Sequence, residues 1–407
     1  MQRRNYAVVT AGYWAFTLTD GALRMLVLLH FHDLGYSPVS IAFLFLLYEF
    51  MGIVTNLVGG WVGARSGLNR TLVAGLGLQV VALAALTFHE ASWPTVAAVA
   101  YVMGFQALSG VAKDLTKMSS KSAVKFIAGE GALFRLVAVL TGSKNALKGV
   151  GFFVGAALLA WLGYDAALWT MVGLIVCALA AVILLLNEDI GRATRKPPLR
   201  SILSTSSAVN RLSAARLFLF GSRDIWFVVA LPIFLDETLG WSFEGIGAFL
   251  AAWVIGYGGI QAAAPRLLWS TRGDLDAEIT ATRTWALVLA AVSATIAVLV
   301  ALDVATTIAV VGGLIVFGVV FALNSSLHSY LILAYSVGDD VSLDVGFYYS
   351  ANAAGRLVGT LLSGVLYLWG GLDAALWGST AFVAIAWLLA LRLPSAETLR
   401  AAPLLSR

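Results

Sequence analysis

The sequence predicts an all-α membrane protein with twelve transmembrane helices in two six-helix halves. Three observations predict this fold class: the composition, a recurring series of apolar stretches, and a repeat that relates the two halves. Of the 407 residues, 60% are hydrophobic and only 12% are charged, and the mean hydropathy is +0.89. Charged residues make up about a quarter of a typical soluble domain, so the chain is too apolar to be one.

Apolar stretches long enough to cross roughly 30 Å of hydrocarbon as a helix recur along the whole chain. Twelve spans are predicted, with the bounds 6–31, 39–63, 71–89, 94–113, 136–162, 166–186, 212–235, 244–264, 284–303, 307–328, 345–369 and 374–392. The first span follows Arg3 and Arg4, as in a secretory signal, but it contains Asp20 and Arg24 and lacks a small-residue cleavage site. It is therefore predicted to be a retained helix.

The basic residues outside these spans predict the orientation. Twenty of the 26 Lys and Arg residues fall in the loops and termini of one side, and the six predicted loops of the other side contain none. Because basic loops stay in the cytoplasm, both termini are predicted to be cytoplasmic in a multi-pass membrane protein. The pI of about 9.2 then reflects topology rather than binding to nucleic acid.

The two halves are predicted to be repeats of one another. The polar stretch 187–210 separates residues 1–186 from residues 211–407 and is expected to be a cytoplasmic linker. Two short sequences recur in order at offsets of 205 and 208 residues, Leu34-Gly35-Tyr36-Ser37 as Leu239-Gly240-Trp241-Ser242 and Asp165-Ala166-Ala167-Leu168-Trp169 as Asp373-Ala374-Ala375-Leu376-Trp377. Parallel six-helix repeats are typical of major facilitator transporters, which bind substrate near the bilayer midplane between the halves and expose it alternately to each side.

The segment Gly60–Arg70 resembles the loop between the second and third helices of those transporters. Its glycines, Arg65 and Arg70 fit the family pattern, but Ala64 stands where an aspartate is usual. The departure bears on the gating charge network of the family and not on its fold.

Buried charge predicts the substrate class. The apolar spans contain five basic residues and three acidic ones, namely Arg24, Lys144, Lys148, Arg223 and Arg356 against Asp20, Glu49 and Asp224. Arg216 is assigned to a helix end. A cation inside the bilayer costs several kcal/mol unless it meets water, a counter-ion or a ligand. The surplus of positive charge therefore predicts a polar cavity that receives an anion.

Two of these cations are related by the repeat. Lys148 lies about 18 Å along its predicted span, too deep to reach the cytoplasm, and an offset of 208 residues leads from it to Arg356. A lysine and an arginine at matching depth are expected to clamp a phosphate or arsonate group. Lys144 and Asn145 lie nearby, and Lys144 either joins this group or extends to the cytoplasm.

The remaining charges leave alternatives open. Asp20 and Arg24, four residues apart, either neutralise each other or act as a proton carrier and a substrate ligand. Glu49 either carries a coupling proton or holds a cation in place. Arg223 and Asp224 are adjacent, point about 100° apart and are not expected to satisfy each other fully, so one of them is expected to face the cavity. Asn56 either lines the cavity or bonds two helices together.

Nothing in the sequence predicts a metal, a cofactor or an enzyme. The four histidines lie near predicted span ends, and Cys177 is the single cysteine. A multispan enzyme or sensor would need a nucleophile, a metal site or a ligand domain, and no phosphate-binding loop, nucleophile elbow or catalytic triad pattern is present.

Five stretches closely resemble the ArsJ organoarsenical efflux permeases, a family within the major facilitators. They are Tyr13–Leu26, Thr55–Trp61, Gly67–Thr71, Gln106–Leu115 and Leu140–Gly149. The resemblance covers mainly the first half of the chain. The second half matches in the pattern of residue types more than in the exact residues.

The resemblance implies export of 1-arseno-3-phosphoglycerate and, with it, resistance to arsenate. It also implies a functional link to glyceraldehyde-3-phosphate dehydrogenase, which makes this compound when arsenate replaces phosphate; the compound decomposes after extrusion. The residues themselves imply only an anion, so an organophosphate or other organic-anion carrier is the alternative. Two groups of cations suit a doubly anionic substrate, with Lys144, Lys148 and Arg356 at one end and Arg24 and Arg223 at the other. Asp20, Glu49 and Asp224 are the candidates for proton coupling in an antiporter.

Overall fold

The computed structural model describes residues 2–66, 68–90, 92–127, 133–186, 206–268, 275–335, 341–395 and 397–398. Almost all of these described residues are helical, and none of them lies in a strand. The helices fall into two compact units, unit 1 with residues 1–199 and 231–255 and unit 2 with residues 200–230 and 256–407.

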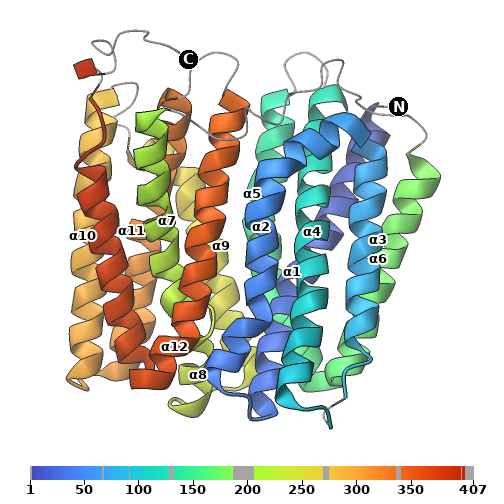
Figure 1. The fold of residues 1–407 in the computed structure, drawn as a ribbon, viewed down its shortest axis with the longest axis horizontal. Coiled ribbons are helices and arrows are strands. Elements are labelled where there is room, and N and C mark those ends of the chain that lie inside the picture. Colours follow the sequence, from blue (N-terminus) through green and yellow to red (C-terminus); the bar gives the residue numbers. More distant parts are fainter. Residues whose placement is uncertain are drawn as a thin grey trace. The chain divides into compact units, whose positions relative to one another are not determined.

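Unit 1 is a bundle in which α1 packs against α4, α5 and α6 (Figure 1). Helix α4 also packs against α2 and α3, and α3 packs against α6. The helices have the bounds α1 Gln2–Asp33, α2 Pro38–Ser66, α3 Leu68–Leu86, α4 Thr95–Ile127, α5 Leu133–Leu162 and α6 Tyr164–Leu185.

Unit 2 is built around the long contact between α7 and α12. Helix α10 packs against both α11 and α12. The bounds are α7 Ser207–Phe227, α10 Leu275–Ala301, α11 Thr306–Tyr335 and α12 Val341–Ala390. The unit boundaries fall at the start of α8 Ala230–Glu237 and within α9 Phe243–Leu267.

The helices account for the twelve predicted spans. Ten of the described helical segments are long and apolar enough to cross a membrane. One of them, 344–390, contains two predicted spans, because α12 is interrupted at Gly370 and Gly371. Gly371 has a φ of 63°, in the left-handed region that glycine adopts without strain. Helix α1 has 32 residues and supplies the remaining span, so the predicted fold class is confirmed.

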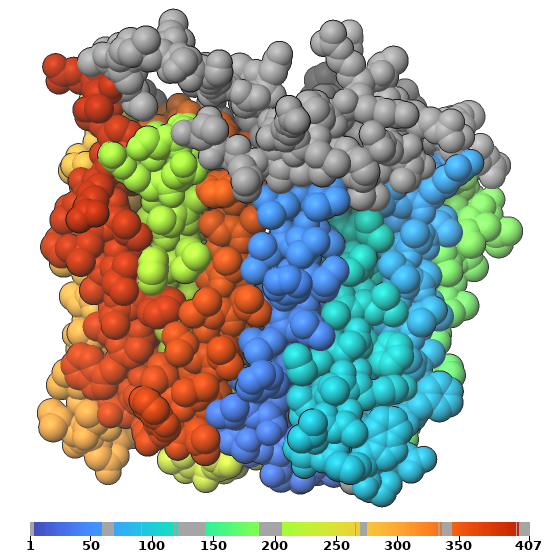
Figure 2. Space-filling view, viewed as in Figure 1, coloured from blue at the N-terminus to red at the C-terminus, as the bar shows by residue number. Residues whose placement is uncertain are grey.

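Large apolar side chains cover the outside of these helices, as lipid contact requires. Trp161, Leu184 and Ile308 are among the most exposed. Figure 2 shows α2, α4 and α3 side by side on one face of unit 1. A surface of this composition fits a bilayer rather than water.

Glycines bring the backbones of α1 and α5 into contact. A Cβ added at Gly151 would lie 2.4 Å from the Leu18 carbonyl oxygen, and one at Gly155 would lie 2.1 Å from that of Ala22. Such small residues allow close approach of membrane helices. The glycines of this helix thus serve helix packing, and they bring Asp20 and Lys148 within reach of each other.

Two sequence predictions fall largely outside the described residues. Most of the predicted linker 187–210 is not described, and the side chains of residues 59–68, which include most of the Gly60–Arg70 loop, are not described either. The division of the chain at that linker therefore stays a prediction.

Candidate functional site

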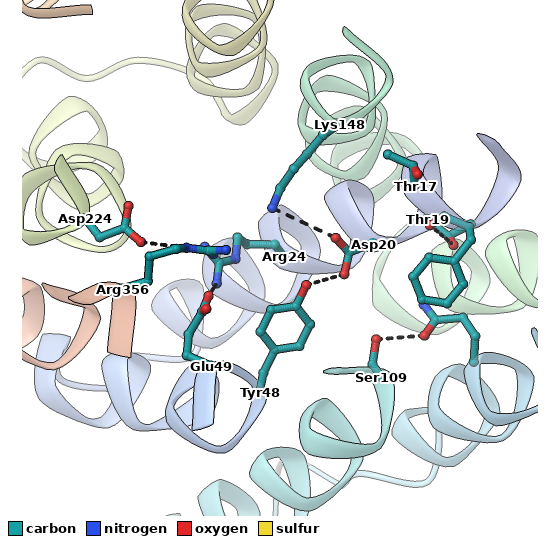
Figure 3. Close-up of polar contacts among 12 residues, drawn as sticks. Thr17, Thr19, Asp20, Arg24, Tyr48, Glu49, Ser109, Lys148, Asp224 and Arg356 are labelled. Atoms are coloured by element: carbon teal, nitrogen blue, oxygen red, sulfur yellow. Dashed lines mark hydrogen bonds and ion pairs between the residues drawn. The ribbon is translucent and has the colours of Figure 1, made fainter. Parts of the chain in front are cut away.

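The first charged pair of unit 1 joins α1 to α2. The Nη2 of Arg24 lies 2.5 Å from Oε1 of Glu49, and both side chains are almost fully buried. The Arg24 guanidinium also lies 5.2 Å from the centre of the Phe45 ring. Figure 3 shows this pair between the two helices. Glu49 thus has the geometry of a counter-ion for Arg24.

The second charged group of unit 1 is centred on Asp20. The Tyr48 hydroxyl donates a hydrogen bond of 2.5 Å to Asp20 Oδ1, and Nζ of Lys148 lies 3.9 Å from Oδ2 (Figure 3). Asp20 and Arg24 therefore engage different partners and do not form the self-neutralising pair that the sequence left open. The contact between Lys148 and Asp20 is thus at the outer limit of an ion pair.

A third charged group lies between α2 and α4 and was missed from the sequence. Buried Asp114 accepts a hydrogen bond from Thr55, and its Oδ1 lies 2.6 Å from Nζ of Lys117. Lys117 also donates to Oδ1 of Asn56 over 3.0 Å, while the Asn56 amide donates to the Gly52 carbonyl. Asn56 thus makes the interhelical bond that was one of its two alternatives.

The predicted position of Lys117 in a cytoplasmic loop is wrong. The predicted span ended at residue 113, whereas α4 continues to Ile127. Polar residues end the hydropathy signal at this point, but Lys117 forms hydrogen bonds inside the bundle with Asp114 and Asn56. The spacing of Asp114 and Lys117, three residues apart on a helix, was the signal available in the sequence.

Unit 2 has one buried carboxylate that holds two guanidinium groups. Asp224 is fully buried. Its Oδ1 accepts a hydrogen bond of 2.7 Å from Nε of Arg223, and its Oδ2 accepts one of 3.1 Å from Nε of Arg356 (Figure 3 shows the second). The long Arg223 side chain folds back onto its neighbour Asp224, but the two do not satisfy each other alone, because Asp224 also binds Arg356.

Arg216 is a sixth buried cation, and its assignment to a helix end is wrong. Helix α7 begins at Ser207, five residues before the predicted start, and Ser206 caps it by accepting a hydrogen bond from the Val209 amide. Arg216 therefore lies about 14 Å along the helix. Only 4% of its surface is exposed.

The contacts of Arg216 are with neutral groups. Its Nε donates to Oδ1 of Asn352 over 2.9 Å, and its Nη1 donates to the carbonyl and hydroxyl oxygens of Ser325 over 3.0 and 3.1 Å. The guanidinium stacks 3.9 Å from the centre of the Phe220 ring and lies 5.0 Å from that of Tyr348.

The other predicted site residues lie on α5. Lys144 and Asn145 are half-buried near the first described side chains of this helix, and each interacts with another residue.

Among the histidines, His32 forms a 2.9 Å contact with Asp236. The described residues contain no group of three or more side chains suited to hold a metal.

The fold and the charges define a class of protein. A bundle of apolar helices, with arginines, lysines and carboxylates gathered in its interior, is typical of an α-helical membrane transporter. Residues 9–336 match the family profile of the Major Facilitator Superfamily, and the chain belongs to this family. It is thus a transporter rather than an enzyme.

Solved structures agree on the fold. A POT family transporter in complex with a thioalcohol-conjugated peptide has 11% identity and a TM-score of 0.75, with 95% of this chain and 96% of that chain covered. A POT family transporter bound to 5-aminolevulinic acid has 11% identity, a TM-score of 0.76 and 95% coverage of both chains. A bacterial homologue of the iron transporter ferroportin, in an inward-facing state, has 14% identity and a TM-score of 0.74 over 95% of this chain and 98% of that chain. No curated protein matches the sequence.

Proposed function

We propose that this transporter exports an organic anion, and that the anion is the organoarsenical 1-arseno-3-phosphoglycerate. The observation that carries the proposal is the charge balance of unit 2. Of three largely buried guanidinium groups, those of Arg223 and Arg356 contact one carboxylate, Asp224, and that of Arg216 is held by the neutral groups of Asn352 and Ser325. A positive surplus in an apolar interior favours an anionic ligand over a neutral or cationic one.

The accessibility of the cations suggests which of them bind the anion. The side chains of Lys148, Arg223 and Arg356 are 19%, 15% and 17% exposed, against 8% for Arg24. We propose that these three, with Lys144 and Asn145 near the end of α5, bind the substrate. Arginine offers a planar fork to an oxyanion group, and lysine a compact charge. Arg24, which is paired with the carboxylate of Glu49, then contributes mainly to the positive field.

The driving force follows from the charge of the substrate. An inside-negative potential of 100 mV favours the exit of each negative charge by about 2.3 kcal/mol. Decomposition of the compound outside would keep its external concentration low. Proton exchange would add to this force if Asp20, Glu49 or Asp224 titrates during the cycle. Asp20 suits that role best, because its contact with Lys148 is long enough to exchange for a bound anion.

The specific substrate rests on the resemblance to the ArsJ permeases. It explains why two groups of cations would be needed, since the proposed substrate has a phosphate at one end and an arsenate at the other. An organophosphate or other organic anion would use the same cations and is the alternative. We also propose that the protein lies in the bacterial inner membrane with both termini in the cytoplasm, on the basis of its basic loops.

Uptake into everted membrane vesicles tests the proposal, because uptake there corresponds to export from the cell. Vesicles would receive arsenate with glyceraldehyde-3-phosphate dehydrogenase, its nucleotide and glyceraldehyde 3-phosphate, or arsenate alone. Accumulation of arsenic only with the complete mixture is expected, and vesicles without the transporter provide the background. Accumulation of a phosphorylated anion without arsenic would favour the alternative, and accumulation of neither would refute anion export.

A further inference from the structure

The surroundings of Arg216 consist of hydrogen-bond donors and neutral acceptors. Its guanidinium is held by the Asn352 side chain of α12 and by Ser325 of α11. Among the residues that the structure describes, no carboxylate makes an ion pair or hydrogen bond with it. Arg216 thus differs from Arg223 and Arg356, which both contact Asp224.

Two further donors gather at the same serine. The hydroxyl of Ser325 accepts a hydrogen bond of 3.1 Å from the Gln261 amide and lies 3.4 Å from the Tyr257 hydroxyl, both from the unit 2 part of α9. A single serine oxygen is therefore shared by a guanidinium, an amide and a phenol. Three donors thus converge on one neutral acceptor, and a cluster of N–H and O–H groups of this kind is suited to an oxyanion.

The guanidinium retains capacity for a ligand. Its Nε and Nη1 make the hydrogen bonds described above, whereas Nη2 makes none to the described part of the chain. Nη2 is not one of the fully buried side-chain polar atoms that lack a hydrogen-bond partner. The Phe220 ring lies against the flat face of the guanidinium and not against its N–H groups.

We propose that Arg216, Asn352 and Gln261, with the hydroxyl of Tyr257, form an oxyanion-binding subsite in unit 2 that is separate from the Asp224 group. The ligand is the phosphate, arsenate or carboxylate end of the transported anion, so the inference rests on the proposed export of an anion. Arg216 and Arg223 are seven residues apart, two turns along one face of α7, and the Phe220 ring contacts both guanidinium groups. A small molecule with an anionic group at each end can therefore bind to both arginines.

The decisive variant is Asn352→Asp, which changes one atom of the side chain and places a carboxylate beside Arg216. It neutralises the cation without removing it, and the new ion pair keeps the bundle folded. The full-length protein would be placed in lipid nanodiscs and titrated with 3-phosphoglycerate and with inorganic phosphate by calorimetry. We expect at least tenfold weaker binding of 3-phosphoglycerate with an unchanged or higher melting temperature. Asn210→Asp, the same substitution at an exposed position of α7, is the matched control and is expected to bind like the unmodified protein.

The outcomes separate this inference from the proposed function. If the unmodified protein binds 3-phosphoglycerate and Asn352→Asp binds it equally well, Arg216 is structural and the subsite is refuted. If the unmodified protein binds neither probe and transports no arsenic in the vesicle assay, anion export itself is refuted. Gln261→Leu, which removes a donor without changing the charge, provides a second measurement. We expect about threefold to tenfold weaker binding from it, and full affinity would also contradict the subsite.

Discussion

Each unit contains an ion pair between an aspartate and a basic residue at corresponding places in the repeat, but the surroundings of the two pairs differ. In unit 1, Asp20 of α1 faces Lys148 of α5; in unit 2, Asp224 of α7 faces Arg356 of α12. The acids are 204 residues apart and the bases 208, close to the offsets of the sequence repeat. The glycines beneath the pairs correspond too, since Gly151 packs on α1 as Gly359 packs on α7.

The difference lies in how the remaining charges are balanced. In the described part of unit 1, Asp20 pairs with Lys148, Glu49 with Arg24 and Asp114 with Lys117. In unit 2 Asp224 has two basic partners, and Arg216 is held by neutral groups. One acid and base pair thus recurs in each unit, and in unit 2 a second arginine, Arg223, shares the same carboxylate.

Loss of the shared carboxylate is expected to give the largest effect. Asp224→Asn leaves Arg223 and Arg356 without their counter-ion in a fully buried position, and breaking a buried pair typically costs about 3–5 kcal/mol. Asp20→Asn should cost only about 1 kcal/mol, because the Lys148 contact is long and the Tyr48 hydroxyl can still donate to the amide oxygen. Melting temperatures of the two purified variants measure the contrast. Equal destabilisation would mean that the two pairs are equivalent despite their surroundings.

Transport is expected to fail when either repeat-related cation is neutralised. Lys148→Gln and Arg356→Gln should each reduce vesicle uptake of arsenic at least tenfold while the protein still reaches the membrane, because each removes a charge that binds the anion. Lys148→Arg introduces the residue type that unit 2 has at the corresponding position, Arg356, and should retain most of the activity. Arg283→Gln is the matched control, since Arg283 binds only the carbonyl oxygens of residues 390, 391 and 393 in the described structure. Normal uptake by both neutral variants would rule out the clamp.

The sequence predicts which charged residues are buried better than it predicts which of them form pairs. The apolar context identifies Asp20, Lys148, Asp224 and Arg356 as buried, and the repeat relates the two bases. It does not predict that Arg223 folds back onto Asp224, because a long flexible side chain can reach any of several neighbours. Partner choice depends on the packing of helices that are distant in sequence.

Helix ends limited the prediction of the site in the same way. Hydropathy ends a span where polar residues begin, yet Arg216 and Lys117 continue their helices because Asn352, Ser325, Asp114 and Asn56 satisfy them inside the bundle. The sequence could not show these partners, since they come from other helices. The number and order of the spans were predictable because each span needs only its own apolar length.

The pH dependence of transport tests whether the unit 1 pair carries a proton. If Asp20 takes up a proton when Lys148 leaves it for the anion, Asp20→Asn removes that step. Uptake into vesicles should then lose its dependence on an imposed pH gradient while it keeps its dependence on membrane potential. Asp114→Asn is the control, because this carboxylate is held by Lys117 and Thr55 away from the proposed anion ligands. An unchanged response of Asp20→Asn to the gradient would exclude Asp20 as the carrier.

The smallest expected effect concerns the α2–α4 contact of unit 1. Asn56→Ala removes the acceptor for Lys117 and the donor to Gly52, and the loss of such hydrogen bonds should lower the unfolding free energy by about 1 kcal/mol. The affinity for 3-phosphoglycerate in nanodiscs should stay within about twofold, since the Lys117 charge is still balanced by Asp114. A much larger loss of affinity with normal stability would instead make Asn56 a ligand. The α2–α4 contact of unit 1 would then belong to the anion-binding site.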